Sequence, residues 1–273
     1  MRRYELTDAQ WERLEPLLPP EKPWTGRPND DHRSILNGIF WILRTGAPWR
    51  DLPPRYGLWA TVASRFYRWR RAGIWQRILE ALQARADAQG WIDWDLHHVD
   101  STVIRAHQHA AGARKPQGRD GETPDEALGR SRGGFTTKIH VRAEGLGKPV
   151  TFALSGGQVH DSQMMEPLMT GGRVKRAGPG RPRSRPCRVA GDKAYSSRKI
   201  RAALRRRGIK PVIPTKANEK PDPFFDRDAY RKRNIVERLI NKLKQFRRIA
   251  TRYEKRAVNY LAMLNLAAIF IWI

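Results

Sequence analysis

FTTKIHVRAEGLGKPVTFAL, residues 135–154, is the stretch of sequence that decides the fold. Over residues 135–143 every second side chain suits a buried face, and this alternation indicates a half-buried strand. Gly145 and Gly147 then predict a turn, after which residues 150–154 supply the returning strand. We therefore predict an antiparallel pair of strands in this part of the chain.

The flanking sequence extends this pair into a mixed α/β domain. Upstream, residues 96–104 form a run that is typical of a strand. Downstream, the predicted elements are a helix at 161–169, a strand at 188–191, a helix that Ser196 caps and that ends before Gly208, a strand at 210–213, a long helix at 226–250 and a terminal helix at 257–273. Three antiparallel strands followed by alternating helices and strands (βββαβαβα) are typical of a ribonuclease-H-like fold.

Two segments of this region predict loops. Residues 104–134 are rich in Gly, Arg, His and Gln and show no apolar period, which predicts a long mobile loop. Residues 171–185 combine Gly and Pro with basic residues and predict a second loop.

The first 90 residues predict a small all-helical domain. Thr7 and Gln10 form a capping box at the start of its first helix. The further helices are predicted at 31–44, 59–71 and 74–89. Short helices joined by tight turns resemble a helix-turn-helix DNA reader, and one of them carries Arg65, Arg68, Arg70 and Arg71. The alternative is a plain helical bundle with a solvated basic face. The chain thus divides into residues 1–90 and 91–273.

Charge narrows the class of partner. The 273 residues contain 53 Lys and Arg against 27 Asp and Glu, which gives a net charge of +26 and favours binding to nucleic acid. A ribosomal or histone-like packing protein is the alternative, but 10 Trp indicate a packed globule. The single cysteine, Cys187, excludes an internal disulfide and fits a reducing cytoplasm. No signal peptide is expected, and the apolar run at 257–273 predicts a buried helix, not a membrane span.

Two aspartates occupy positions where a carboxylate is costly. Asp100 lies within the strand HHVDSTVI, and Asp192 follows the strand in RVAGDKAY. A carboxylate among apolar residues needs a compensating charge, and Mg²⁺ prefers oxygen ligands of this kind. The alternative is that both are ordinary turn or capping residues.

A stripe of polar residues follows the predicted long helix. Tyr230, Arg233, Glu237 and Lys244 are spaced so that they fall within about 60° of one another on a helix with about 100° per residue. A glutamate can hold a metal, two cations can hold phosphates and a phenol can bond to the DNA backbone. The alternative is an exposed polar face in which Glu237 pairs with a nearby Arg.

These residues carry a specific resemblance. Tyr-x₂-Arg-x₃-Glu-x₆-Lys is the YREK signature of a large group of insertion-sequence transposases, and the four residues match it at every spacing. The segments that resemble the insertion-sequence family-five transposases are TGAPWRDLPPRYG (45–57), VDSTVIRAH (99–107), GRSRGGFTTKIH (129–140), GDKAYSS (191–197) and RNIVERLINKLKQFRRIATRYEK (233–255). The resemblance extends over most of the chain.

The resemblance implies a DDE transposase with a ribonuclease-H-like fold. Asp100, Asp192 and Glu237 fall where the family has its catalytic acids, which would hold two Mg²⁺ ions, with Mn²⁺ as a substitute. The other three signature residues would bind DNA. Only 44 residues separate Asp192 from Glu237, which leaves no room for the large β-rich insertion of some YREK transposases.

The implied reaction frees a 3′-OH at each end of the element and joins it to target DNA. The implied partners are double-stranded DNA, as terminal inverted repeats and as target, and a second copy of the chain; no membrane is expected, and the expected location is the nucleoid in the cytoplasm. A DDE-fold nuclease without strand transfer and a non-catalytic DNA-binding regulator are the alternatives.

A few further residues allow other interpretations. Asp161 is predicted to cap a helix, with a role as a fourth acid as the alternative. His97, His98, His107 and His109 could form a histidine metal site, but acids and phosphate chemistry favour Mg²⁺. Ser101 has no base beside it that would predict a serine recombinase.

Overall fold

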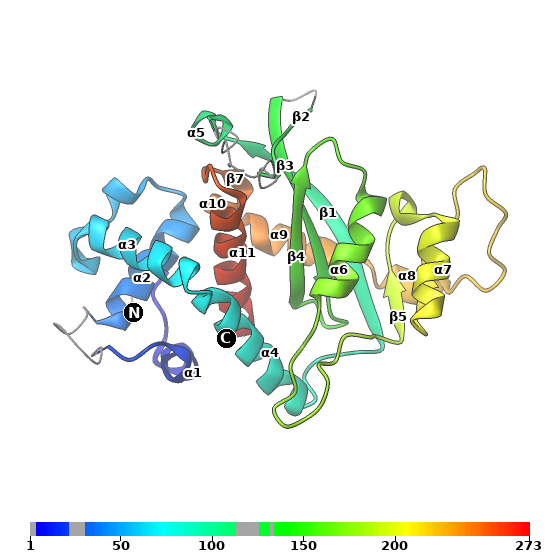
Figure 1. Ribbon diagram of the computed structural model, residues 1–273, viewed down its shortest axis with the longest axis horizontal. Helices are drawn as coiled ribbons and strands as arrows, with labels where there is room; N and C mark the ends of the chain where they lie inside the picture. Colours follow the sequence, from blue (N-terminus) through cyan, green and yellow to red (C-terminus); the bar gives the residue numbers. More distant parts are fainter. Residues whose placement is uncertain (1–3, 22–30, 113–125, 132–133) are drawn as a thin grey trace, which may run out of the picture.

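The computed structural model describes residues 4–21, 31–112, 126–131 and 134–273. It has one mixed sheet at its centre (Figure 1), with the N-terminal helices on one side and helices α6 and α7 on the other. The predicted α/β class is confirmed.

The N-terminal helices begin and end close to the predicted residues. They are α1 (Asp8–Leu14), α2 (His32–Thr45), α3 (Trp59–Arg71) and α4 (Ile74–Ala88). Thr7 and Gln10 make both bonds of the predicted capping box. Gly46 ends α2 at φ 72°, a left-handed conformation that an L side chain rarely adopts. Gly73, at φ 68°, separates α3 from α4.

The sheet is built around a long central strand. Its strands are β1 (Leu96–Ala106), β2 (Gly129–Ser131), β3 (Gly134–Ala143), β4 (Pro149–Gly156), β5 (Arg188–Ala190), β6 (Lys210–Val212) and β7 (Thr251–Arg252). The order across the sheet is β4-β3-β1-β5-β6, in which β3 is antiparallel to both β4 and β1. The strands β5 and β6 run parallel to β1, and the short β2 and β7 pair with β3 and β1.

The remaining helices cover this sheet. They are α5 (Gln108–Ala111), α6 (Met165–Gly171), α7 (Arg198–Arg206), α8 (Arg227–Arg231), α9 (Asn234–Lys244), α10 (Arg247–Ala250) and α11 (Ala257–Trp272). Two short 3₁₀ turns, η4 (Asp161–Met164) and η5 (Lys193–Tyr195), precede α6 and α7.

The predicted long loop is only partly correct. The strand β1 continues to Ala106, and α5 and β2 also lie within residues 104–134. The predicted mobility falls on residues 113–125 and 132–133, which lie outside the described residues.

The predicted cap at Ser196 is wrong. The helix α7 begins after Ser197, and Ser196 is occupied elsewhere: its hydroxyl donates to Glu219 and accepts a bond from Arg201. A hydroxyl that is already bonded to two other side chains is not available to cap the helix.

The predicted long helix at 226–250 is also wrong, because it is divided into α8, α9 and α10. The Arg233 amide bonds to the Tyr230 carbonyl at 2.9 Å and the Val236 amide to the Arg233 carbonyl at 3.1 Å, so the chain tightens into a 3₁₀-like turn. At the second break Phe246 is extended, with ψ 101°, and its ring is buried.

Both faces of the sheet are packed. The larger apolar cluster joins the N-terminal helices, α9 and α11 to the face that carries Ile139 and Val141. The smaller cluster joins α6 and α7 to the opposite face, which carries Val99.

The helix α11 is central to the larger cluster. It is buried as predicted, and the Trp272 indole donates to the Pro149 carbonyl at 2.8 Å. Within the described residues, no helix has both the length and the apolar composition needed to cross a membrane.

Candidate active site

Asp100 lies in the middle of β1, which has neighbouring strands on both sides. Its Oδ1 accepts a bond from the Ser101 amide at 2.8 Å, and its Oδ2 accepts one from the Arg233 guanidinium, also at 2.8 Å. Burial raises the pKa of Asp100 above its ordinary value, and the nearby Asp192 adds to this rise, while the Ser101 amide and Arg233 oppose it. The strand thus holds a carboxylate that needs a cation.

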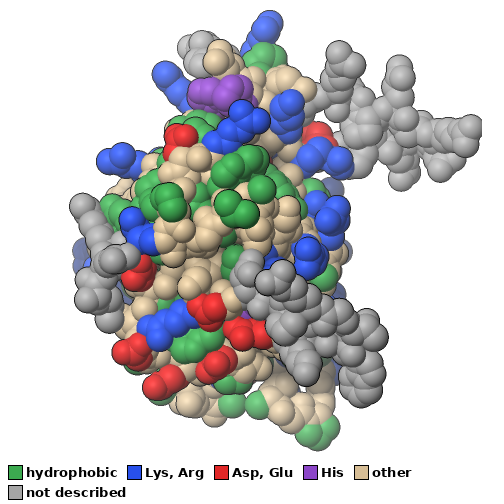
Figure 2. All heavy atoms as spheres, turned by 90° about the vertical axis from the view of Figure 1, so that its left-hand side faces the viewer, with side chains coloured by type: hydrophobic (Ala, Val, Ile, Leu, Met, Phe, Trp, Pro, Cys, Tyr) green, Lys and Arg blue, Asp and Glu red, His purple; other side chains and the backbone are tan. Residues whose placement is uncertain are grey.

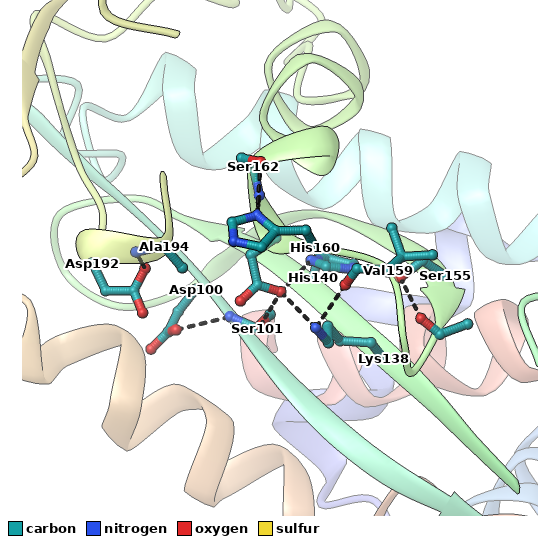
Figure 3. Close-up of polar contacts among 12 residues, drawn as sticks. Asp100, Ser101, Lys138, His140, Ser155, Val159, His160, Ser162, Asp192 and Ala194 are labelled. Atoms are coloured by element: carbon teal, nitrogen blue, oxygen red, sulfur yellow. Dashed lines mark hydrogen bonds and ion pairs between the residues drawn. The ribbon is translucent and has the colours of Figure 1, made fainter. Parts of the chain in front are cut away.

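Asp192 lies at the end of β5, next to Asp100. Because β5 runs parallel to β1 and is hydrogen-bonded to it, the end of β5 reaches the middle of β1, and Figure 3 shows the two carboxylates side by side. The Oδ1 of Asp192 accepts a bond from the Ala194 amide at 2.9 Å and so caps η5. Asp192 is therefore both a capping residue and a neighbour of Asp100.

Arg233 connects Glu237 to this pair. One terminal nitrogen of its guanidinium donates to Asp100 and the other to Glu237. The Arg233 side chain is 18% exposed and that of Glu237 is 50% exposed. Asp100 and Glu237 are therefore separated by a single guanidinium group, which makes this Glu–Arg pair part of the site.

The donor set suits a hard divalent cation. Carboxylate oxygens are the ligands that Mg²⁺ prefers, and a positive group already stands between Asp100 and Glu237. No group of three His, Cys, Asp or Glu in the described part of the chain is close enough together to form a metal site. Since Arg233 occupies the space between two of the acids, a cation would have to displace this guanidinium.

The other two predicted signature residues lie at different places. Tyr230 is on α8, where its ring packs 5.4 Å from that of Phe225, and its carbonyl accepts the bond from the Arg233 amide. Lys244 is exposed at the end of α9, and no ion pair is found for it among the described residues. The break between α8 and α9 means that the four residues do not share one helix.

Asp161 does not cap a helix, which corrects the sequence prediction. His160 takes that position, because its Nδ1 accepts a bond from the Ser162 amide. The Oδ1 of Asp161 instead accepts bonds from the Ser101 hydroxyl at 2.8 Å and from Lys138 at 3.0 Å (Figure 3). Since side chains alternate along a strand, Ser101 leaves the face of β1 opposite to Asp100. Asp161 thus contacts β1 on the face opposite to the one from which the Asp100 side chain extends.

Tyr195 is a residue of the site that the sequence did not single out. Its ring is fully buried, and none of the described residues lies within hydrogen-bonding reach of its hydroxyl. Burial raises the pKa of Tyr195 well above its ordinary value, and the charges of Asp161, Asp100 and Asp192 raise it further. The charges of three aspartates thus act on this hydroxyl. Its position directly after GDKA was the only signal in the sequence.

The histidines do not gather around Asp100. Burial lowers the pKa of His98 to about 4, so this residue is neutral at ordinary pH. His97 accepts a bond at Nδ1 from Arg142, which is itself buried. The rings of His107 and His109 contact each other at 4.6 Å near α5.

Comparisons with known proteins cover both parts of the chain. The family model described as "Putative transposase of IS4/5 family" matches residues 6–79, and the one described as "Transposase DDE domain" matches residues 98–272. An uncharacterized protein of Sinorhizobium fredii (strain NBRC 101917 / NGR234), y4sN, is 38% identical over 128 residues, which are 47% of this chain and 96% of that protein.

Two further proteins are similar to this chain. The "Putative transposase for insertion sequence element IS402" of Burkholderia cepacia is 34% identical over 135 residues, 50% of this chain and 62% of that protein. Among solved structures, the piggyBac transposase in a synaptic complex with hairpin DNA is 12% identical, with a TM-score of 0.47, and the match covers 95% of this chain and 69% of that one.

Proposed function

This chain belongs to the family of DDE transposases, and from that membership we propose that Asp100, Asp192 and Glu237 are the acids with which it cleaves transposon ends and joins them to target DNA. The observation that carries this assignment is the Arg233 guanidinium, which links Asp100 on the central strand to Glu237 on α9 while Asp192 lies beside Asp100. Three acids that are far apart in the sequence thus belong to one site.

We assign the catalytic domain to the ribonuclease-H-like fold. The strand order β4-β3-β1-β5-β6, in which β3 runs opposite to the other four strands, supports this assignment, as do the helices that follow β4, β5 and β6. We propose residues 91–273 as this domain and residues 1–90 as the DNA-binding helical domain.

Transposases of this family use divalent metal ions, and we propose that the three acids hold two Mg²⁺ ions, with Mn²⁺ as a substitute. When bound, such ions polarise the attacking hydroxyl and stabilise the leaving 3′-oxygen. The protein's own part is to hold the acids on the strand β1, at the cap of η5 and on the helix α9. Arg233 keeps Asp100 and Glu237 paired until a cation takes its place.

The remaining signature residues are proposed to hold DNA. Released from the acids, Arg233 can bind a phosphate in bidentate fashion, which suits its planar fork of donors. Lys244 is exposed and suits a second phosphate, and Tyr230 lies close to Arg233 with its hydroxyl as a donor to the backbone. Together these groups would orient the strand that is cut.

The N-terminal helices are proposed to read the terminal inverted repeats, in a dimer that brings two ends together. Arg68 and Arg71 on α3 are exposed and can reach DNA. Arg65 of the same helix is buried and lies 3.0 Å from His32, so it supports the helix and does not contact DNA.

The test replaces two of the acids without changing their size. Asp100→Asn and Glu237→Gln should each reduce end cleavage and joining by more than about 100-fold. Replacing a residue that only hydrogen-bonds to a metal ligand already lowers metal affinity or activity about 10–100-fold, and the loss of a ligand itself should cost more. Binding to end DNA should persist in a gel-shift assay. Asp228→Asn, at an exposed residue of α8, is the matched control and should remain active.

Separate substrates distinguish the alternatives. A pre-cut end with a free 3′-OH should still be joined to a plasmid by the wild-type protein. Cleavage without this joining would support a DDE-fold nuclease, and binding without either reaction would support a regulator. Undiminished joining by the Asp100→Asn variant would overturn the assignment of the acids.

A further inference from the structure

The positive charge of this chain is concentrated in one segment. Residues 171–210 contain 15 Lys and Arg and a single acid, Asp192, so this segment contributes +14 of the net +26. The first 90 residues contain 15 Lys and Arg and 10 acids, a net charge of only +5. Figure 2, which shows the side of the N-terminal helices, accordingly has Asp and Glu side chains among the Lys and Arg.

The charged segment borders a hollow between α6 and α7. Two adjoining cavities of about 610 Å³ and 290 Å³ share Met169 and Arg207 in their walls. Their apolar lining includes Met165, Ile200 and Leu204. The cations around them are Arg173, Arg185, Lys199, Arg206 and Arg207. We call these two cavities with their five cations the basic trough.

Most of this charge is not neutralised by the protein. Among the described residues, the only acid in the walls of the trough is Glu166, which pairs with Arg207. Within the part of the chain that the structure describes, Arg173 and Arg185 donate to backbone carbonyls, at 3.1 Å and 3.3 Å, and to no carboxylate. The described residues include no carboxylate partner for the remaining two cations, which are exposed on α7. Like charges held this close repel one another, and a polyanion would relieve that repulsion.

The trough adjoins the turn that carries Asp161 and the segment that follows Asp192. Two of its lining residues, Ser162 and Gln163, follow Asp161 directly, and Ser197 lies in the segment that follows Asp192. The turns η4 and η5, which carry these residues, contact each other. In Figure 1 the trough's helices α6 and α7 lie across the sheet from the N-terminal helices.

We propose that the basic trough binds the phosphate backbone of the target DNA, an inference that rests on the proposed strand-transfer function. Target DNA presents its phosphates whatever its base sequence, so a set of cations can hold it without contacts to base edges. Long cationic side chains around an apolar floor suit that task. The N-terminal helices carry a nearly balanced charge. This suits the transposon ends, which must be recognised by their base sequence and not through their phosphates alone.

The test reverses two exposed charges on α7. Lys199→Glu with Arg206→Glu should lower the joining of pre-cut ends to a plasmid at least tenfold, while gel-shift binding and hydrolysis of end DNA stay at the wild-type level. The matched control is Lys220→Glu with Lys255→Glu, which makes the same charge change at exposed residues outside the trough.

Salt dependence gives a second, independent measurement. Each phosphate contact contributes about 0.9 to the slope of log affinity against log salt concentration. The Lys199→Glu, Arg206→Glu double variant, called the α7 variant below, loses two contacts, so its slope for a duplex of random sequence should be smaller by about 1.8. Fluorescence anisotropy with a labelled duplex measures this slope. Lys199→Gln with Arg206→Gln makes the same measurement with a smaller perturbation if the reversed charges prevent folding.

The outcomes separate the two proposals. If the wild-type protein joins no ends, the proposed strand-transfer function is overturned, and the salt dependence still tests whether the trough binds DNA. If it joins ends and the α7 variant joins them equally well with an unchanged slope, the trough does not bind DNA. If the variant instead loses binding to end DNA, the trough holds the transposon end and its assignment to target DNA is overturned.

Discussion

Single residues of the candidate site could be predicted where a carboxylate interrupts or directly follows an apolar strand, since such a position is costly for a charge. Asp100 and Asp192 were identified in this way, and the structure places them side by side. Their tertiary partners could not be predicted, because Arg233 lies 133 residues from Asp100 in the chain. Tyr195 was missed because a tyrosine after a strand is more often a core residue than part of a site.

The Tyr195 hydroxyl allows a prediction about stability. A buried donor without a partner costs about 1–3 kcal/mol, so Tyr195→Phe should raise the free energy of unfolding by about 1 kcal/mol. The matched control is Tyr260→Phe, which removes a buried hydroxyl that donates to the Ile249 carbonyl at 2.6 Å and should lower the stability by a similar amount. Urea denaturation measures both. Equal losses in the two variants would show that the Tyr195 hydroxyl has a partner in solution.

At the scale of elements, local sequence determined where most helices begin and end but not whether the last long one is continuous. Caps and glycines are local signals, and they placed α1 to α4 correctly. The breaks beside α9 have no such signal, since Lys232 and Arg233 tolerate a helix well. The first break is accompanied by a contact that only the folded chain provides: the bond from Arg233 to Asp100.

This break leads to a prediction about metal binding. Arg233→Gln leaves Asp100 without its cation and should lower the unfolding temperature in a chelator, at a cost of about 1–3 kcal/mol. Added Mg²⁺ should then stabilise this variant more than the wild type, because no guanidinium has to be displaced. Differential scanning fluorimetry with and without Mg²⁺ measures the difference.

The control for this experiment lies on α8. Arg231→Gln removes an exposed ion pair with Asp228, which should change stability by less than about 1 kcal/mol and leave the Mg²⁺ effect unaltered. An equal gain from Mg²⁺ in the wild type and in Arg233→Gln would mean that the cation binds without displacing the arginine.

At the scale of the whole molecule, the change of sequence texture near residue 90 predicted two regions but not how they pack. One apolar cluster includes side chains from α2, α3 and α4 together with α9, α11 and the sheet. Periodicity indicates which face of an element is buried but not which distant element covers it. The helical region and the sheet therefore share one core.

A shared core predicts a single unfolding transition. Leu264→Ala on α11 should cost roughly 2–5 kcal/mol, because this side chain is fully buried, and should destabilise both regions together. Far-UV circular dichroism and tryptophan fluorescence should report the same midpoint. Val258→Ala, at a residue of α11 that is 46% exposed, should change stability by no more than about 0.5 kcal/mol. Two separate midpoints would show that the regions unfold independently.

The position of α11 also bears on how the chain matures on the ribosome. At about 5–20 residues per second, the nascent polypeptide would wait on the order of ten seconds between the emergence of α4 and that of α11. During that interval α11 is not yet available to bury the apolar side chains of the N-terminal helices. A gene copy interrupted before α11 would therefore yield a fragment with exposed apolar surface, which chaperones and proteases would bind. Such a fragment would not be stable enough to compete with the full-length protein for DNA.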